Sequence, residues 1–524
     1  MNKKQLSIII GTILSLIFIL AIISLHNVDP SSIDWVTGGG CDNLQHYLGW
    51  RFFRESDWNR YFLFMRNLNY PVGTSIIVTD SNPLFCLFFK LIRNLLPDIF
   101  QFNGLWLVFS YSLLGFFAGL ILWRLTSNLT LTLSGTLLII LNPVIMQRAL
   151  IHDTLTAHWL ILAAVWLFLN YDKKWNIPGW IILTETTLLI HIYFIPMIAF
   201  VLLLQMIHMA VKKHSLIRML LPAFVFAAAL ATGYFIFGYS HILPQTGSYG
   251  ELSMNLNAFI NPDSIPALLK SRPTNPLQYE GFNYWGIGVL LMLFFGIISG
   301  KRKFFLKILP FLIPCILLIL ASASNEIYFD KKLLLKFEIP TYLSSVLSVF
   351  RSSGRLVWPI YYLVLIYSIY MIKTNQKNLL VSQVISVLCV FLQFLDLGQF
   401  FLLTSDHFRN PSNQLAVIPD ELEEIITDDI QNIFCSDGDA KTVDALSLYA
   451  IDHHKTFNKN ANAREIKHIY GGDILDMNSL TCQQVKSDSV YIFLNKMEFP
   501  PALTNCENTE IAEWNSWILI KQTR

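Results

Sequence analysis

Four short segments of the sequence carry acidic, basic, amide or imidazole side chains at spacings that suit chemistry. In the first, GGGCDNLQHYLGW, three glycines precede Asp42, Gln45 and His46. A carboxylate that takes the proton of an attacking hydroxyl contributes roughly 10²–10⁴-fold to a reaction rate. Its position just outside the first predicted membrane span makes Asp42 the leading candidate for such a base, with Gln45 and His46 as its neighbours on the substrate. The alternative is that Asp42 only caps a helix or lies in a plain loop.

The second and third segments each offer a further carboxylate. In TDSNPL, Asp80 is either part of a site or, like Ser81, a cap for the helix that Pro83 begins. In RALIHDTLTAHW, His152, Asp153 and His158 lie within about two helical turns and could converge on one pocket. The alternative there is that Asp153 caps the next helix while the histidines line the membrane interface.

The fourth segment, FRSSGR, places Arg351 and Arg355 on either side of a turn that contains Ser353. Guanidinium groups and exposed backbone N–H groups suit a phosphate or pyrophosphate ligand, although arginines at this place also reach toward lipid phosphates. Asn261 and Tyr284, in NLNAFINP and EGFNYWG, add an amide and an aromatic ring. Such groups suit a sugar, but they also form ordinary interface belts.

The elements that position these residues are expected to be membrane helices. The 524 residues are 54% hydrophobic and only 14% charged, against roughly 25% charged in a soluble domain. A net charge of +2 with scattered basic residues argues against nucleic-acid binding, which needs a concentrated basic face. Hydrophobic runs near the roughly 20-residue length of a span predict about eleven spans: 6–25, 104–124, 129–147, 156–171, 178–192, 194–211, 216–238, 284–299, 304–322, 356–372 and 378–397.

The basic residues predict the orientation of these spans. If the N-terminus is cytoplasmic, the inner loops 172–174, 212–218, 300–303 and 373–377 all carry lysine or arginine, as the positive-inside rule requires. The segments 26–103, 239–283, 323–355 and 404–524 then lie on the outer face. We expect a multi-pass membrane protein whose work is done outside; the family resemblance described below implies that this membrane is the bacterial inner membrane.

We predict two domains, a mainly α-helical polytopic bundle over 1–403, including the first outer loop 26–103, and a small periplasmic α/β domain over 404–524. An acidic helix-like stretch at Pro419–Ile430 and strand-like pieces at Ser489–Leu494 and Trp517–Lys521 support the second. A disulfide among Cys435, Cys482 and Cys506 is permitted on the oxidising side, and we favour Cys482 with Cys506. No Cys-x-x-Cys or histidine-rich spacing indicates a metal.

Acids inside the predicted spans offer a competing function. Glu185 and Asp396 could mark an ion path, because intramembrane acids are functional candidates by default. Two isolated acids without an inverted pair of broken helices are a weak pattern for a transporter.

The topology, with a long first outer loop that opens on an acid, resembles the GT-C class of integral-membrane glycosyltransferases. GGGCDNLQHYLGWRFFR, NYPVGTSIIVTDSNPL, HDTLTAHWLIL, NLNAFINP and FRSSGRLVWPIYYL are similar, more narrowly, to a bacterial membrane family placed near the transferases that use lipid-linked sugars. This resemblance spans roughly residues 35 to 400.

The resemblance implies a sugar donor linked to undecaprenyl phosphate, a membrane lipid, and a cell-surface glycan acceptor such as O-antigen or a wall polysaccharide. In this class an acid of the first outer loop acts as the general base, and the resemblance assigns this role to Asp42. It suggests Asp80 and Asp153, less directly, as further catalytic acids. Members that need a metal pair their acids as Asp-Asp or Asp-x-Asp, and 26–103 lacks that spacing, so we expect no metal or other cofactor. One base and one cationic clamp suffice for an inverting displacement. A lipid-linked-glycan flippase or transporter and a polysaccharide polymerase are the alternatives.

Overall fold

The protein divides into two units, each of which gathers segments that are distant in sequence. The computed structural model describes residues 2–38, 42–243, 249–300, 302–340, 342–343, 347–375, 378–412, 415–419, 421–459, 464, 466–467, 469–471 and 473–523. The membrane unit comprises 1–32, 102–234 and 244–410, and the extramembrane unit comprises 33–101, 235–243 and 411–524. Gly39, Gly40 and Cys41 of the first chemical segment lie outside the described residues, as do Lys301, Gln376 and Lys377 of two inner loops.

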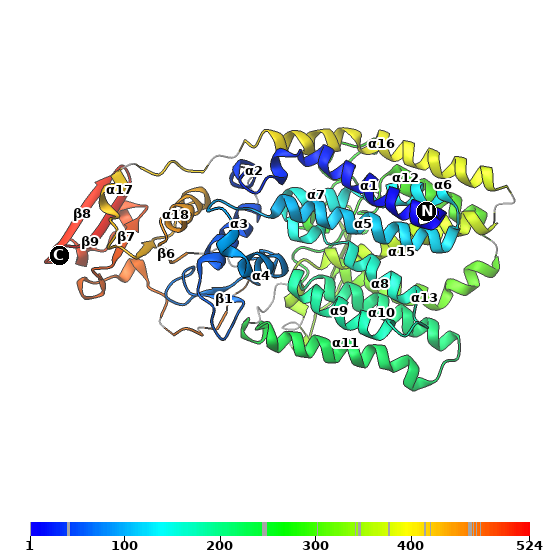
Figure 1. Ribbon diagram of the computed structural model, residues 1–524, viewed down its shortest axis with the longest axis horizontal. Helices are drawn as coiled ribbons and strands as arrows, with labels where there is room; N and C mark the ends of the chain where they lie inside the picture. Colours follow the sequence, from blue (N-terminus) through cyan, green and yellow to red (C-terminus); the bar gives the residue numbers. More distant parts are fainter. Residues whose placement is uncertain are drawn as a thin grey trace. The chain divides into compact units, whose positions relative to one another are not determined.

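Helices dominate the membrane unit (Figure 1). Asn142 and Pro143 separate two of them, α6 and α7, because the Asn142 side chain accepts a hydrogen bond from the Val144 N–H and Pro143 occupies the first helical position. The helices are α1 (Lys3–Ile23), α5 (Asn103–Thr126), α6 (Leu129–Ile140), α7 (Pro143–Ile151), α8 (Trp159–Leu169), α9 (Asn176–Ile190), α10 (Phe194–Val211), α11 (Leu216–Ile236), α12 (Ile287–Ser299), α13 (Arg302–Ala323), α15 (Trp358–Asn375) and α16 (Leu379–Arg409).

Eight helical segments of the described chain are long and apolar enough to cross a membrane, fewer than the eleven expected. The remaining three predicted spans are helical but shorter: α8 has 11 residues, α9 has 15 and α12 has 13. α8 is shorter than expected because the 3₁₀ turn Asp153–Thr156 precedes it, and α12 because Gly286, with φ +82°, precedes its first residue, whereas α9 has the expected length and begins two residues earlier.

Two local predictions about the bundle are confirmed. The long run 178–211 breaks as expected, because α9 ends at Ile190 and α10 begins at Phe194, two residues before Pro196. The first apolar segment forms α1 and packs closely on α5. A Cβ at Gly115 would lie 2.7 Å from the Gly11 carbonyl oxygen, and Ser15 Oγ donates to the Tyr111 carbonyl oxygen at 2.5 Å. Small residues at such crossings let membrane helices approach each other.

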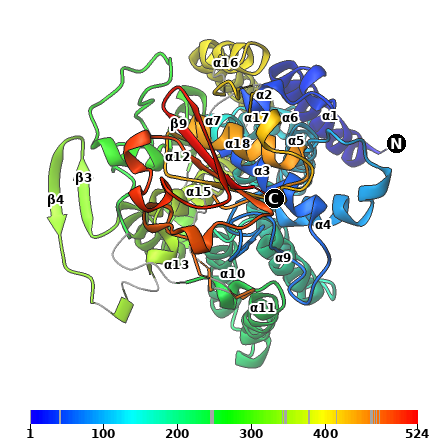
Figure 2. The same ribbon diagram turned by 90° about the vertical axis from the view of Figure 1, so that its left-hand side faces the viewer.

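Short elements connect the helices of the membrane unit at the ends where the candidate residues lie. They are the 3₁₀ turns η3 (Asp153–Thr156), η5 (Pro276–Gly281), η6 (Ser348–Phe350) and η7 (Ser353–Val357) and the antiparallel hairpin of β3 (Glu326–Phe329) with β4 (Lys332–Lys336). The hairpin lies at the edge of its unit in Figure 2, and β4 is exposed along its length.

The extramembrane unit joins the first outer loop to the tail, whereas the sequence assigned 26–103 to the domain 1–403. Leu68 pairs with Phe457 in an isolated parallel bridge, and the Phe457 N–H donates to the Asn67 carbonyl oxygen at 2.9 Å. Arg51 pairs with Asp452 at 2.8 Å. The loop contributes α2 (Asp34–Thr37), α3 (Asp42–Glu55), β1 (Phe64–Met65), β2 (Thr74–Ser75) and α4 (Pro83–Leu91).

The tail folds around a five-stranded sheet of order β6-β5-β7-β9-β8, in which β5 is parallel to β6 and β7. The expected strands are present as β7 and β9, while the acidic stretch is helical only over α17. The disulfide Cys482–Cys506 is formed and Cys435 is free and buried. The elements are α17 (Glu421–Ile425), β5 (Asn432–Cys435), α18 (Ala440–Asp452), β6 (Thr456–Phe457), β7 (Ser489–Phe493), β8 (Thr509–Trp514) and β9 (Trp517–Gln522).

Candidate functional site

Three charged side chains from distant segments meet in the membrane unit, and we call them the arginine–glutamate cluster: Arg148, Glu280 and Arg355. Arg148 Nη1 lies 2.7 Å from Glu280 Oε2. Arg355 approaches both carboxylate oxygens, with Nε 3.0 Å from Oε2 and Nη2 2.8 Å from Oε1. One carboxylate therefore fixes the direction of two planar guanidinium groups.

The cluster is buried, and its charge is settled by the ion pairs. Burial raises the pKa of Glu280, but the guanidinium groups of Arg148 and Arg355 lower it by more, with a further contribution from His152. The pKa of this carboxyl therefore lies well below its usual range, and Glu280 is ionised at any physiological pH.

Close backbone packing brings Glu280 to Arg355. The next residue after Glu280 is Gly281, and a Cβ at Gly354 would lie 2.6 Å from the Gly281 Cα. A Cβ at Gly281 would in turn meet the Ser253 carbonyl oxygen. Only glycines at both positions let η5 and η7 touch in this way. Asn283 Nδ2 locks the contact by donating to the carbonyl oxygens of Gly281 and Gly354 at 2.9 and 3.0 Å.

Aromatic and imidazole rings surround the two arginines. The Arg148 guanidinium lies 5.9 Å from the Trp358 ring centroid, and that of Arg355 lies 4.9 Å from the Tyr193 centroid. The His152 and His191 rings lie 5.3 Å apart. Such faces favour a cation electrostatically, so they add to the orientation that Glu280 imposes.

The three residues predicted to bind a phosphate, Arg351, Ser353 and Arg355, have different surroundings. Arg355 belongs to the cluster, but its partner is Arg148 and not the expected Arg351, which is half-exposed and forms no ion pair within the described residues. Ser353 is buried, and its hydroxyl donates to the Ser322 carbonyl oxygen at 3.2 Å. Ser353 and Arg355 both belong to the 3₁₀ turn η7, in which Arg355 is turned inward.

The predicted group His152, Asp153 and His158 contacts several different partners. Asp153 Oδ2 accepts from Asn103 Nδ2 at 2.7 Å, so this carboxylate ties η3 to α5 and does not cap α8. His158 is fully buried, stacks on Trp358 with 4.3 Å between ring centroids and lies 2.7 Å from the Tyr362 hydroxyl through Nδ1. Of the three residues, His152 is the one that contributes to the field at Glu280.

Two predicted sugar-binding residues have structural partners. The Asn261 amide holds its own loop, with Oδ1 accepting from the Arg272 N–H at 2.8 Å and Nδ2 donating to the Arg272 carbonyl oxygen at 3.1 Å. The Tyr284 hydroxyl donates to Asp396 Oδ2 at 2.7 Å. Asp396 also accepts from the Leu268 and Ile287 N–H groups, which explains this buried acid without an ion path.

Four predicted residues lie in the extramembrane unit, three of them on α3. Asp42 is exposed at the first position of this helix, Gln45 is half-buried and His46 is buried. Asp80 has φ +55° and does not cap α4, because Asn82 is the residue whose side chain accepts from the Phe85 N–H. Of these four, Asp42 has the exposure that a base needs to meet a substrate, although an acid in a first turn also stabilises the helix dipole.

Sequence reasoning missed Arg148 and Glu280 as site residues. Both lie inside segments that drew attention for other side chains. The sequence does contain a signal for them, because charged residues are few in this chain, at 14%. Each of the two lies at the end of a predicted span, where a buried charge requires a partner.

The fold and the cluster define a multi-pass membrane protein whose connections hold a buried ionic site. The chain belongs to the family described as a domain of unknown function (DUF6311), whose model matches residues 12–398. The match covers, in whole or in part, each described helix of the membrane unit and the first outer loop, and it ends before the tail. No curated protein is similar enough to this chain to count as a match.

Proposed function

We propose that this protein is a GT-C-type glycosyltransferase that moves a sugar from an undecaprenyl-phosphate-linked donor to a cell-surface glycan on the outer face of the bacterial inner membrane. The arginine–glutamate cluster is the observation that carries the proposal. Guanidinium groups that are already oriented lose little entropy when they meet a phosphate, and this cluster lies where helices of the membrane unit end. A lipid-linked donor presents its phosphate at that depth.

The contacts of the cluster also support a finer topology, with eleven spans. Glu280 and Arg355 touch, so both lie on one side of the membrane. Among the described residues between them, α12 and α13 are the long helices, and α13 contains a full-length span. An even number of crossings is needed between two residues on one side, so α12 crosses as well.

The same reasoning applies to α8 and α9. Asp153, just before α8, contacts Asn103 at the start of α5, and Asn170, just after α8, accepts from Arg124 Nη1 near the end of α5 at 2.8 Å. The segment 153–170 therefore runs the length of α5, which is long enough to span. His152 and His191 lie together, so α9 returns to the starting side. Residues 148, 280 and 355 then lie on the side of the membrane on which α1 ends.

The proposed reaction is a direct displacement at the anomeric carbon. An acceptor hydroxyl oxygen forms a new bond to the anomeric carbon, and the bond between this carbon and the phosphate oxygen breaks. The hydroxyl proton passes to the Asp42 carboxylate, and the bond electrons leave with the lipid phosphate. Cations near this phosphate stabilise the charge as it develops, which is the role we assign to Arg148 and Arg355. Glu280 positions them without touching the substrate.

The test compares Asp42→Asn with Asp57→Asn, which alters another exposed acid of the first outer loop. Each variant is expressed in cells that lack the gene, its level in the membrane is measured by immunoblot, and the sugar composition of the surface glycan is determined by mass spectrometry. We expect the wild type and Asp57→Asn to restore one sugar. Asp42→Asn should restore less than about 1% of it, a loss of at least the roughly 10²-fold that a general base supplies.

Other outcomes separate the alternatives. Full restoration by Asp42→Asn would remove the base assignment. A deletion that lowers glycan export without changing its composition would indicate a flippase, and a deletion that changes only chain length would indicate a polymerase.

A further inference from the structure

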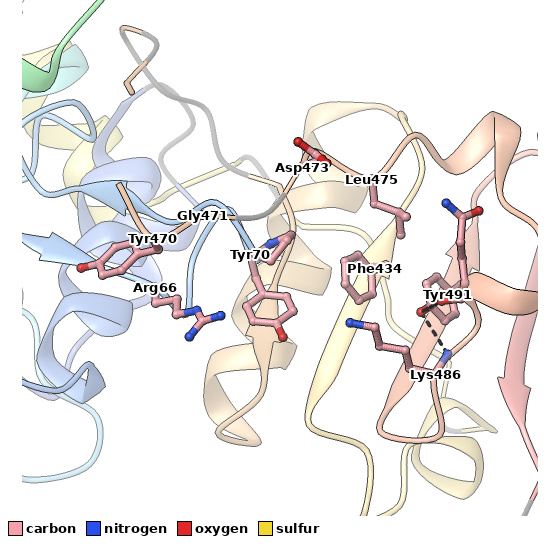
Figure 3. Close-up of a pocket in the computed structure, with 11 residues that line it drawn as sticks. Arg66, Tyr70, Phe434, Tyr470, Gly471, Asp473, Leu475, Lys486 and Tyr491 are labelled. Carbon is pink, nitrogen blue, oxygen red and sulfur yellow. Dashed lines mark hydrogen bonds between the residues drawn. The ribbon is translucent and has the colours of Figure 1, made fainter. Parts of the chain in front are cut away.

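The extramembrane unit contains a cavity of about 340 Å³ between the turn that follows β1 and the tail (Figure 3). This volume lies at the small end of the roughly 300–1,000 Å³ typical of small-molecule sites. At roughly 30 Å³ per water molecule it equals about eleven waters, close to the about twelve non-hydrogen atoms of one hexose. Its lining comprises Arg66, Tyr70, Pro71, Phe434, Tyr470, Gly471, Asp473, Leu475, Gln484, Lys486 and Tyr491.

Aromatic rings form the inner surface of the cavity. Phe434 and Tyr491 are buried and stack with centroids 5.0 Å apart and an interplanar angle of 9°. The Tyr70 ring lies 5.8 Å from Phe434 at 60°. Tyr491 is held because its hydroxyl donates to the Gln484 carbonyl oxygen at 2.9 Å. These rings are fixed by the sheet and by the core of the unit.

The turn that carries Tyr70 is also fixed. The Gly73 N–H donates to the Asn69 carbonyl oxygen at 2.8 Å, and Gly73 has φ +77°. A Cβ at Gly73 would lie 2.5 Å from a Tyr470 ring carbon, so glycine is needed for this contact. Asn59 Nδ2 donates to the Tyr470 hydroxyl at 3.0 Å. The first outer loop and the tail thus hold two tyrosines in place at one cavity.

Charged side chains stand at the mouth of the cavity. Arg66, Asp473 and Lys486 are exposed, and none of the three forms an ion pair within the described part of the chain. The Arg66 guanidinium lies 6.0 Å from the Tyr70 centroid, and in the view of Figure 3 Arg66 and Lys486 flank the Tyr70 ring. The lining therefore carries two cations and one acid over an aromatic surface.

We propose that this cavity binds one sugar residue of an anionic glycan. Flat rings accept the apolar faces of a sugar, the cations pair with its carboxylate or phosphate groups, and Gln484 and Asp473 offer hydrogen-bond partners to its hydroxyls. The role of this glycan as the acceptor rests on the function proposed above. The binding itself does not.

The test uses the full chain in lipid nanodiscs, because detergents with sugar head groups would compete for the cavity. Digalacturonic acid is the anionic probe and galactobiose its neutral counterpart, and isothermal titration calorimetry gives the affinities. We expect the anionic probe to bind more tightly. Arg66→Gln and Lys486→Gln should each weaken it by about tenfold, as loss of a hydrogen bond to a charged group does, and should leave the neutral probe unchanged.

The matched control is Lys441→Gln, which removes an exposed lysine of α18 that does not line the cavity. It should bind both probes as the wild type does. If this variant weakened binding of the anionic probe as much as Arg66→Gln and Lys486→Gln do, the probe would be attracted by exposed positive charge in general, which would overturn the proposal. Absence of binding by either probe at millimolar concentration, or equal affinity for both, would also overturn it. Asp42→Asn should bind the anionic probe normally, so failure of transfer and failure of this site are distinguishable.

Discussion

The two units bury cationic side chains by different means. In the membrane unit, Arg148 and Arg355 share the carboxylate of Glu280. In the extramembrane unit, Lys90 is 1% exposed, and its ammonium group donates to Ser56 Oγ at 2.7 Å and lies 4.0 Å from the Phe53 ring centroid. Lys90 forms no ion pair among the residues that the structure describes.

The difference teaches what each unit can do with its charge. A carboxylate partner and the high pKa of guanidinium groups make the cluster permanently ionic. Aromatic faces and one hydroxyl compensate a cation less completely, and burial together with the nearby charge of Arg93 lowers the pKa of Lys90 to about 7. The first arrangement holds a fixed field, whereas the second can lose its proton near neutral pH.

The largest effect is expected from Glu280→Gln. This change leaves two guanidinium groups buried without their counter-charge, and breaking a buried ion pair by removal of one partner costs about 3–5 kcal/mol. The free energy of unfolding, measured by equilibrium denaturation of the full chain in mixed micelles, should fall by that amount.

Two exposed acids provide the controls for this prediction. Glu251→Gln in the membrane unit and Asp473→Asn at the cavity of the extramembrane unit should each change the free energy of unfolding by no more than about 0.5 kcal/mol. If Glu280→Gln were equally mild, the cluster would not depend on its carboxylate and the comparison of the two units would lose its basis.

A smaller loss is expected from Gly281→Ala, which keeps all three charges and disturbs only their approach. The added methyl group would meet the Ser253 carbonyl oxygen and lie 2.6 Å from the Met254 Cα. Backbone atoms must shift, and overpacking of this kind costs about 1–3 kcal/mol. Thermal unfolding would measure this loss of stability. The transfer assay should show a lower rate as well, because Arg355 moves with η7.

Gly398→Ala is the matched control, since a Cβ at Gly398 meets nothing within 4 Å. It lies within α16 and should be neutral or slightly stabilising, because alanine is the better helix former. Equal losses for both alanine variants would mean that helix flexibility, and not the contact of η5 with η7, decides the stability.

Much of the fold could be predicted because its determinants are local. Hydropathy locates the membrane helices, Pro196 marks the break between α9 and α10, and the pairing of Cys482 with Cys506 agrees with the favoured assignment. The eight long spans needed no knowledge of tertiary contacts. The shorter helices α8, α9 and α12 could not be assigned as spans in this way, since contacts such as that of Arg124 with Asn170 are needed to show how far the segment of α8 extends.

The site could be predicted only in part because it depends on meetings between distant segments. The sequence indicates Arg355, but its partners come from residues 148 and 280, and their approach requires Gly281 against Gly354. Neither glycine lies in a sequence pattern that predicts the close backbone contact of η5 with η7. In the same way, no local signal tells that Phe457 of the tail pairs with Leu68 of the first outer loop and so shapes the cavity.

The last prediction tests the second way of burying a cation, and its effect is the smallest when it is measured for each pH unit. The pKa of Lys90 is about 7 in the folded protein and about 10.4 in the unfolded chain. Between these values the unfolded state binds more protons, so stability should rise with pH from about 7 to 10, by at most about 1.4 kcal/mol per pH unit. Below pH 7 both states are protonated and the contribution becomes constant.

Lys90→Met isolates this contribution, because methionine fills similar space between Phe53 and Trp58 without a titratable group. Thermal unfolding of the full chain in nanodiscs, followed from pH 6 to 10, should give a steeper rise for the wild type than for Lys90→Met. Parallel curves would show that the aromatic faces hold the ammonium form, since these faces favour the cation. Lys90 would then be as permanently charged as the arginines of the cluster. Both units would hold a permanently charged buried cation, one with a carboxylate partner and the other with aromatic rings.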